Sequence, residues 1–370
     1  MRAPADKFVL IWDFIPRLRR MFESWLIRQA EALRDEGIEF HVCFSGQPVD
    51  WFAQEFARVG GVAHVRESMR GRLDKEAAVA LIRSLGRTGL GICFYPMLSP
   101  ATLRLTRLSE VTGAMFIDQS SKPVPRRTGW KALAVRLRGQ LGARCYRRII
   151  TVSDYNRDKL VHRLGVPAGR VERLYNGVDL ARFEAPPTSD PLNGPILYVG
   201  QMEGYKGVPT LLSAYEELRR RRQDAPALKL AGGGALLDAL RSQGVPPGVE
   251  LLGLRNDAPD LMREARCIVI PSEWEEACAF AAIESMASGR PVVASNAGSL
   301  PELLAGKAAI FKKGDVQGLV EALERVLFGV TAAAAERDAK VLREHAFREF
   351  SFDRMVEAYQ APILDVCGRA

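Results

Sequence analysis

The chain has 370 residues, with 47% apolar residues, 26% charged residues and a formal net charge of +8. This length exceeds what one hydrophobic core usually organises, so we expect two domains with large cores. The chain has no run of about 18 apolar residues, which excludes a transmembrane helix. The mild positive charge is compatible with anionic ligands, acidic lipid surfaces or nucleic acid, and does not choose between them.

The cysteines and the amino terminus indicate a reducing compartment. None of the six cysteines forms a Cys-x-x-Cys pair, so neither a zinc site nor a redox pair is indicated. A disulfide framework is not expected in a chain of this length. The first apolar run, near residues 8–14, is too short for a signal peptide, and Asp6 and Asp13 interrupt this part of the chain. We expect reduced thiols and a cytoplasmic protein.

In the first half of the chain, short apolar runs alternate with amphipathic segments. The first predicted strand is followed by a helical pattern over 18–37 that ends at Gly37. The predicted strands lie at 8–14, 38–46, 61–65, 91–96, 114–118 and 148–153. Regular alternation of strands and helices predicts a parallel sheet covered on both faces.

The alternation stops over 180–195, which is rich in Pro, Ser and Gly and is the best linker. It then restarts, with strands expected at 195–200, 228–234, 249–254, 267–272, 291–295 and 308–314, and the last forty residues look helical. The fold class expected is α/β, with two Rossmann-like, doubly wound domains facing a cleft. Ligands bind such sheets at the carboxyl ends of the strands.

Residues 271–295, PSEWEEACAFAAIESMASGRPVVAS, place two carboxylates around seven uncharged residues. If a helix begins near Cys278, Glu276 precedes it and Glu284 lies nearly two turns inside. The first turn of a helix offers unpaired N–H groups and a partial positive charge, which suit a phosphate. Glu284 could then accept hydrogen bonds from paired hydroxyls such as those of a ribose. The alternative is a packing helix with two solvated glutamates.

This stretch resembles the retaining glycosyltransferases of family 4, which have the GT-B fold. The resemblance rests on Pro271-Ser272, the two glutamates and the run SMASGRPVVAS, and it extends over roughly 150–305 through ILYVGQMEGYKGV, LAGGGALLDALR and LLGLRNDAPDLM. It implies domains at 1–185 for the acceptor and 186–348 for a nucleotide sugar. It also implies that a C-terminal helix, 349–370, packs back on the first domain.

The resemblance also implies roles for individual residues. Glu284 would bind the ribose of the donor, Glu276 the donor sugar, and Lys206 the diphosphate. The other donor-binding positions would be Gly200, Gln201, Leu254, Arg255, Cys278, Ala279 and Phe280. Without the resemblance, Lys206 could be a solvated lysine in a turn. Cys278 could be either a thiol of lowered pKa or a small residue that fills space.

The chain departs from the family pattern at several places. Gln201 stands where the family usually has arginine, and Ala277-Cys278-Ala279 replaces a Pro-Phe-Gly or Gly-Phe-Gly loop. Residues 12–20 replace a glycine pair. In the first half, Asp118 stands at a strand end where many members carry a histidine. Asp118 is either a catalytic or acceptor-orienting carboxylate, or an N-cap or turn residue.

A departing diphosphate accumulates negative charge, which a lysine and a helix N-terminus stabilise without a metal. The sequence contains no Asp-x-Asp pair or His/carboxylate cluster, so we expect no metal and no cofactor beyond the nucleotide diphosphate sugar. Retention of configuration is implied by the resemblance alone.

The segment 122–148 contains nine Lys or Arg and no acidic residue, and its apolar residues recur at helical spacing. We expect this segment to contact an anionic membrane, although a basic solvated face whose apolar stripe packs on its own sheet is the alternative. Nucleic-acid binding is not expected, because aromatic interleaving and a known module are both missing.

These observations together predict a metal-independent, retaining glycosyltransferase of the hexosyltransferase type. It would transfer a sugar to a saccharide or lipid-linked acceptor in lipopolysaccharide or exopolysaccharide biosynthesis, at the inner face of the cytoplasmic membrane. A non-catalytic nucleotide-sugar-binding subunit is the first alternative. A nucleotide-sugar epimerase or phosphorylase is the second.

Overall fold

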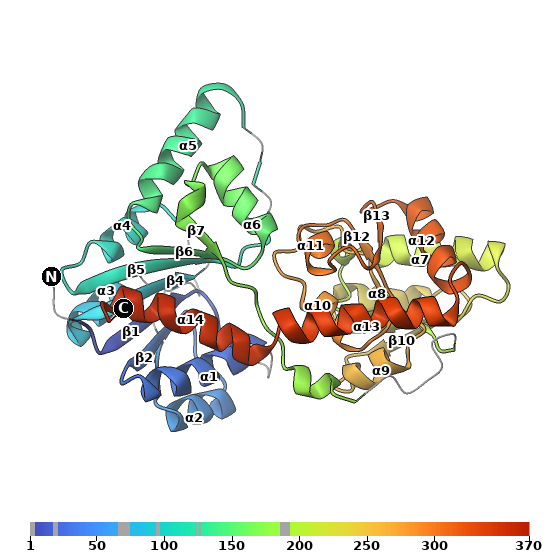
Figure 1. The fold of residues 1–370 in the computed structure, drawn as a ribbon, viewed down its shortest axis with the longest axis horizontal. Helices are drawn as coiled ribbons and strands as arrows, with labels where there is room; N and C mark the ends of the chain where they lie inside the picture. Colours follow the sequence, from blue (N-terminus) through green and yellow to red (C-terminus); the bar gives the residue numbers. More distant parts are fainter. Residues whose placement is uncertain are drawn as a thin grey trace. The chain divides into compact units, whose positions relative to one another are not determined.

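The computed structural model describes residues 4–17, 21–65, 75–93, 97–122, 124–125, 127–185 and 193–369. The chain divides into two compact units (Figure 1). The first unit contains Met1–Gly177 and Phe352–Ala370, and the second contains Val178–Ser351. Parts of three predicted elements, 18–20, 94–96 and 186–192, lie outside the described residues.

The first unit is built on a parallel sheet of seven strands within the described residues, in the order β3-β2-β1-β4-β5-β6-β7. The strands are β1 (Lys7–Trp12), β2 (Glu39–Phe44), β3 (Gly61–Val65), β4 (Thr88–Cys93), β5 (Val111–Asp118), β6 (Arg148–Thr151) and β7 (Val171–Arg173). The helices are α1 (Met21–Asp35), α2 (Asp50–Arg58), α3 (Lys75–Leu85), α4 (Pro100–Thr106), α5 (Gly129–Ala143), α6 (Asp154–Asp158), the π-helical turn η1 (Lys159–Arg163), the 3-10 turn η2 (Ala168–Arg170) and α14 (Phe352–Cys367).

Strand β1 is buried on both faces of this sheet, which explains its continuous apolar sequence. Phe8, Leu10 and Trp12 belong to the core beneath α1, α2 and α14. Val9 and Ile11 belong to the opposite core, which α3 and α4 cover. Alternate side chains of the strand therefore serve two separate cores.

The C-terminal helix α14 belongs to the first unit although its sequence follows the second (Figure 1). It packs against α1, β4 and β5. Gly113 makes this approach possible, because a Cβ there would lie 2.9 Å from the carbonyl oxygen of Val366. Thr112 Oγ1 donates to the same oxygen at 2.7 Å. The predicted return of the C-terminal helix to the first domain is confirmed.

The second unit is built on a parallel sheet of six strands within the described residues, in the order β10-β9-β8-β11-β12-β13. The strands are β8 (Ile196–Val199), β9 (Leu228–Ala231), β10 (Val249–Gly253), β11 (Cys267–Ile270), β12 (Val292–Ser295) and β13 (Ala309–Phe311). The helices are η3 (Leu180–Phe183), η4 (Gly204–Lys206), α7 (Val208–Arg221), α8 (Ala235–Gln243), α9 (Ala258–Glu264), α10 (Phe280–Ala287), α11 (Leu300–Leu303), α12 (Val316–Phe328) and α13 (Ala332–Glu349).

The expected pair of Rossmann-like sheets is confirmed. Two details differ from the sequence-based expectation. Helix α10 begins at Phe280, with Ala279 as its N-cap, two residues after Cys278. Strand β7 was not predicted, because it has three residues of which only Val171 is buried. No helix among the described residues is long and apolar enough to cross a membrane.

Candidate functional site

In the second unit, the order of the strands creates a switch point between β8 and β11. From β8 the chain proceeds outward to β9 and β10 on one side, and then returns to β11, β12 and β13 on the other. In open parallel sheets, ligands bind outside the carboxyl ends of the strands where the order reverses. The segments that leave these two carboxyl ends are 200–207 and 271–279, and both contain predicted site residues.

Lys206 and Glu276 meet at this switch point. The Lys206 Nζ atom donates to Glu276 Oε1 at 2.7 Å, and the two side chains are 24% and 12% exposed. Ser272 Oγ donates to the same carboxylate oxygen at 2.7 Å. These two donors fix the position of the Glu276 carboxylate beside Lys206.

Two glycines allow the backbones of this site to approach closely. Gly207 has φ +75°, and a Cβ there would lie 1.8 Å from the carbonyl oxygen of Pro271. Gly298 has φ +56°, and a Cβ there would lie 2.3 Å from the backbone nitrogen of Glu276. The Lys206 turn and the Glu276 loop are thus positioned by contacts that only glycine permits.

Gln201, where the family usually has arginine, contacts neighbouring aromatic residues. Tyr205 Oη donates to Gln201 Oε1 at 3.2 Å, and Tyr198 Oη donates to the Gln201 carbonyl oxygen at 2.7 Å. Burial raises the pKa of Tyr198, and the negative charge of Glu276 adds to this effect. Tyr198 therefore stays a neutral hydrogen-bond donor that orders the turn after β8, next to Gly200.

Helix α10 carries Glu284 in its second turn. Ala279, the N-cap residue, makes no side-chain cap hydrogen bond, and the first turn of the helix carries a partial positive charge. Glu284 is half-buried, and burial raises the pKa of its carboxyl group while Arg182 opposes this shift. A partly desolvated carboxylate of this kind gains from hydrogen bonds that hydroxyl groups of a ligand donate.

Leu254 and Arg255 follow β10 at the carboxyl edge of the same sheet. Leu254 is 73% exposed, and its Cδ1 would lie 3.9 Å from a Cβ placed at Gly233, in the turn after β9. Arg255 Nε donates to Asp257 Oδ1 at 2.8 Å. An exposed leucine beside a glycine turn offers an apolar surface on which a planar base can lie.

A second ion pair adjoins the site, and the sequence analysis did not find it. Lys313 Nζ, after β13, donates to Glu275 Oε1 at 2.6 Å, and the Gly298 N–H donates to Glu275 Oε2 at 3.1 Å. These contacts hold the loop that carries Glu276. The partners lie far apart in the sequence and belong to no recognised pattern, so only the fold brings them together.

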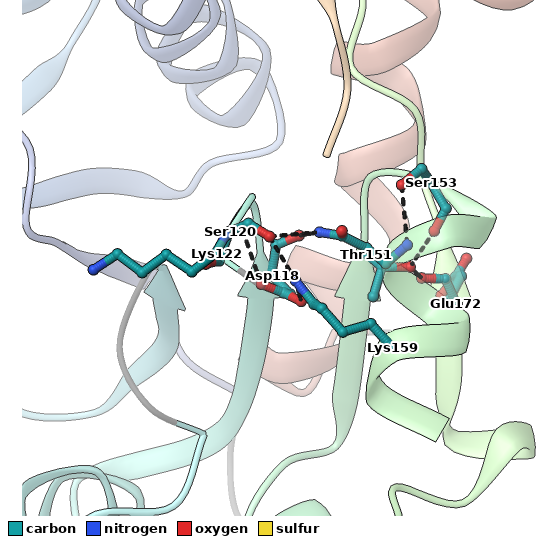
Figure 2. A network of polar contacts seen from close by, with 8 residues as sticks. Asp118, Ser120, Lys122, Thr151, Ser153, Lys159 and Glu172 are labelled. Carbon is teal, nitrogen blue, oxygen red and sulfur yellow. Dashed lines mark hydrogen bonds and ion pairs between the residues drawn. The ribbon is translucent and has the colours of Figure 1, made fainter. Parts of the chain in front are cut away.

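In the first unit, Asp118 ends β5 and is engaged by its own neighbours (Figure 2). Lys159 Nζ lies 3.2 Å from Asp118 Oδ2, with both side chains 7% exposed. The Ser120 N–H donates to Asp118 Oδ1 at 3.0 Å, and Lys159 Nζ also donates to the Ser120 carbonyl oxygen at 2.5 Å. Lys122 points away from this cluster in Figure 2.

Asp118 is therefore the acceptor of a turn and one member of a buried ion pair. Asn156 extends this network, because its Nδ2 donates to the carbonyl oxygens of Asp118 and Ser120 at 3.3 Å each. The described residues contain no group of three or more His, Cys, Asp or Glu side chains that could hold a metal ion.

Comparison with protein families covers most of both units. A family model described as "Glycosyltransferase Family 4" matches residues 22–182, and one described as "Glycosyl transferases group 1" matches residues 194–328. The chain belongs to glycosyltransferase family 4. The resemblance predicted from the second half of the chain is thereby confirmed.

Relatives of this family 4 chain include a glycogen synthase of Mycobacterium tuberculosis, 30% identical over 57% of this chain and 52% of that protein. An O-antigen chain mannosyltransferase B of Escherichia coli is 30% identical over 46% of this chain and 49% of that protein. The chain spans about half the length of the curated relatives that it matches.

Solved structures of low sequence identity share the GT-B fold. A glycosyltransferase from Rickettsia africae has a TM-score of 0.74 at 16% identity, covering 99% of this chain and 100% of that one. The Anabaena HepE protein, solved in complex with UDP, has a TM-score of 0.73 at 16% identity, covering 97% of this chain and 100% of that one.

Proposed function

We propose that this protein transfers a sugar from a nucleotide diphosphate sugar to a saccharide or lipid-linked acceptor. The observation that carries the proposal is the contact of Lys206 with Glu276 at the switch point of the second sheet. The Anabaena structure with UDP and the relatives named as a glycogen synthase and a mannosyltransferase support a nucleotide-sugar donor.

In the proposed complex, the diphosphate lies against Lys206 and the N-terminus of α10. The bond between the sugar C1 and the diphosphate oxygen breaks, and its electron pair stays on that oxygen. Lys206 and the helix stabilise this charge, because such donors act most strongly where charge develops. The acceptor oxygen then bonds to C1 on the same face, and its proton passes to the departing phosphate.

The remaining residues bind the two ends of the donor. Glu276 accepts hydrogen bonds from hydroxyls of the sugar, and Glu284 accepts them from the ribose. Leu254 and Arg255 border the base, while the backbone from Cys278 to Phe280 faces the phosphates. Asp118, through its contacts with Lys159 and Ser120, shapes the carboxyl end of β5 in the acceptor-binding unit.

The donor is identified by thermal shift with UDP-, GDP-, ADP- and dTDP-sugars. A donor at 100 times its dissociation constant adds about 2.7 kcal/mol to the free energy of unfolding. Lys206→Ala should lower the turnover of that donor by about 10²–10³-fold. Lys312→Ala, which removes an exposed lysine after β13, is the matched control and should leave turnover unchanged. Equal turnover in both variants would contradict the assignment of Lys206.

A non-catalytic nucleotide-sugar-binding subunit is the second candidate, and two observations favour it. Gln201 supplies no cation where the family usually has arginine, and Asp118 is occupied by Lys159 where many members have histidine. Hydrolysis of the bound donor in water decides between the two. A protein that is stabilised by a nucleotide sugar but never cleaves it, with or without acceptors, fits the second candidate.

A further inference from the structure

Helix α5 packs on the first unit through its smallest residues. Its buried positions are Gly139, Gly142 and Ala143. A Cβ at Gly139 would lie 1.8 Å from the carbonyl oxygen of Leu164, and one at Gly142 would lie 3.1 Å from Leu98 Cβ. The helix backbone therefore touches its neighbours directly, and its large side chains are not needed for packing.

The large apolar side chains of α5 lie on the opposite, exposed face. Trp130, Leu133, Leu137 and Leu141 are 75%, 59%, 50% and 54% exposed. Their spacing of three, four and four residues aligns them on one side of the helix. They form half of the eight large apolar residues that are exposed within the described part of the chain. Single exposed leucines are common on protein surfaces, whereas a contiguous exposed apolar face is characteristic of an interaction site.

Basic residues border this apolar face on both sides. At about 100° per residue, Lys131 and Arg138 lie on one flank and Arg136 on the other. All three are exposed, as are Lys122, Arg127 and Arg144 nearby. The segment 122–148 contains no acidic residue. The alternative that the apolar stripe packs on its own sheet is excluded by its exposure.

We propose that the exposed face of α5 binds the surface of an anionic lipid bilayer. Trp130 and the three leucines enter the boundary between headgroups and acyl chains, while the exposed side chains of Lys131 and Arg136 extend to lipid phosphates. Arg138 donates to the Leu98 carbonyl oxygen and contributes its charge from that position. A second copy of this chain is the less suitable partner, because two such faces would bring like charges together. The proposal stands on α5 alone and does not require the proposed function.

Binding is measured by sedimentation of the whole protein with vesicles of zwitterionic lipid, and of the same lipid with about a third anionic phospholipid. The protein should sediment with the anionic vesicles only, and added salt should release it. Trp130→Ala/Leu137→Ala should lower the partition coefficient by at least tenfold. Val341→Ala, which removes an exposed apolar side chain of α13, should not change it.

A pair of charge variants separates α5 from the net charge of the protein. Lys131→Gln/Arg136→Gln should weaken binding by about 25-fold, since each basic residue at the surface contributes about fivefold. Arg337→Gln/Lys340→Gln removes the same charge from exposed positions of α13 and should change binding by less than threefold. Thermal unfolding of every variant checks that α5 stays folded.

Three results would overturn the proposal. The first is failure of the protein to sediment with anionic vesicles. The second is equal weakening by the α5 variants and the α13 controls. The third is self-association in the absence of lipid that Trp130→Ala/Leu137→Ala abolishes, which would assign the apolar face of α5 to a second copy of the chain.

Discussion

Lys206 and Glu276 neutralise each other in the structure, so a diphosphate that contacts Lys206 competes with Glu276 for the same ammonium group. The pair is mostly buried, with exposed fractions of 24% and 12%. Removing one partner of such a pair leaves the other charge uncompensated. A bound diphosphate can supply that compensation to Lys206, whereas Glu276 keeps the hydrogen bond from Ser272 Oγ.

This competition predicts opposite effects on binding and turnover for Glu276→Gln. Loss of the carboxylate frees Lys206 and removes a repulsive charge, so affinity for a nucleoside diphosphate should stay equal or rise by up to about fivefold. Turnover should fall by about 10²-fold, because the donor sugar is no longer held in place. Calorimetric titration and initial rates measure the two quantities. Glu273→Gln is the matched control in the same loop, and parallel losses of affinity and turnover in Glu276→Gln would instead indicate a structural role.

Glu284 leads to a prediction about stability and pH. Burial raises the pKa of this carboxyl group in the folded protein. At pH values between the ordinary pKa and the raised pKa, the folded state binds more protons than the unfolded state. The free energy of unfolding therefore falls as the pH rises through this range, and it stays lower at higher pH, where the carboxylate is ionised. Glu284→Gln should therefore unfold at higher denaturant concentration than the wild type near pH 8, and this gain should shrink as the pH falls towards about 5.

The same variant should bind the nucleotide about 10- to 100-fold more weakly, because hydrogen bonds to a charged acceptor contribute about 1.5–3 kcal/mol. Urea unfolding at several pH values and nucleotide titration check both parts. A variant that is less stable at every pH, with unchanged affinity, would show that Glu284 serves packing.

At the level of residues, the sequence singled out candidate site residues but not the contacts that hold them. Lys206, Glu276 and Glu284 were chosen from their spacing and from the family pattern, and the structure joins the first two directly. Ser272 as a donor to Glu276, and Lys313 as the partner of Glu275, were not found. Contacts of this kind depend on strand order, which residue types alone do not encode.

Elements with regular periodicity were predicted best. Where a tertiary contact overrides local preference, the sequence misleads, as at the start of α10. Ala277, Cys278 and Ala279 would all be tolerated in a helix, but the Glu276 backbone is held by Gly298 and Ser299. The Ser299 N–H donates to the Glu276 carbonyl oxygen at 2.8 Å. The helix therefore begins only at Phe280.

The turn η4 leads to a prediction at the same scale. Gly207→Ala should cost about 1–2 kcal/mol for the left-handed backbone alone, and more because the new Cβ would meet the Pro271 carbonyl oxygen. The turn must then move away from β11, taking Lys206 with it, so turnover should fall by roughly 10²-fold. Urea unfolding and initial rates measure these effects.

Gly306→Ala is the matched control for Gly207→Ala. The φ of Gly306 is +69°, close to that of Gly207, but a Cβ there would meet nothing within 4 Å. This control should show the backbone cost without the loss of turnover. If both variants lose activity equally, close packing of η4 on β11 is not what positions Lys206.

For the whole molecule, the two units have separate hydrophobic cores. The first unit is formed by the N-terminal part of the chain together with the C-terminal residues from Phe352 on. The cores beneath α1 and α14 and beneath α3 belong to the first unit, and the core beneath α7 and α12 belongs to the second. The length of the chain predicted two domains, whereas the return of α14 was predicted only from the family resemblance. Its apolar residues at helical spacing predict a buried face without saying which sheet covers it.

Separate cores predict separate responses to mutation and to ligand. Tyr359 on α14 is 1% exposed and packs edge-on against Trp25, with ring centroids 5.1 Å apart. Tyr359→Ala should destabilise the first unit by about 3–5 kcal/mol. The donor nucleotide, which we propose to bind residues of the second unit, should still stabilise that unit by about 2.7 kcal/mol at 100 times its dissociation constant. Calorimetry of the variant should show two unfolding transitions. The nucleotide should not change the midpoint temperature of the first, and it should raise the midpoint temperature of the second. A single transition whose midpoint shifts with the Tyr359→Ala substitution and with the nucleotide would mean that the two units unfold together.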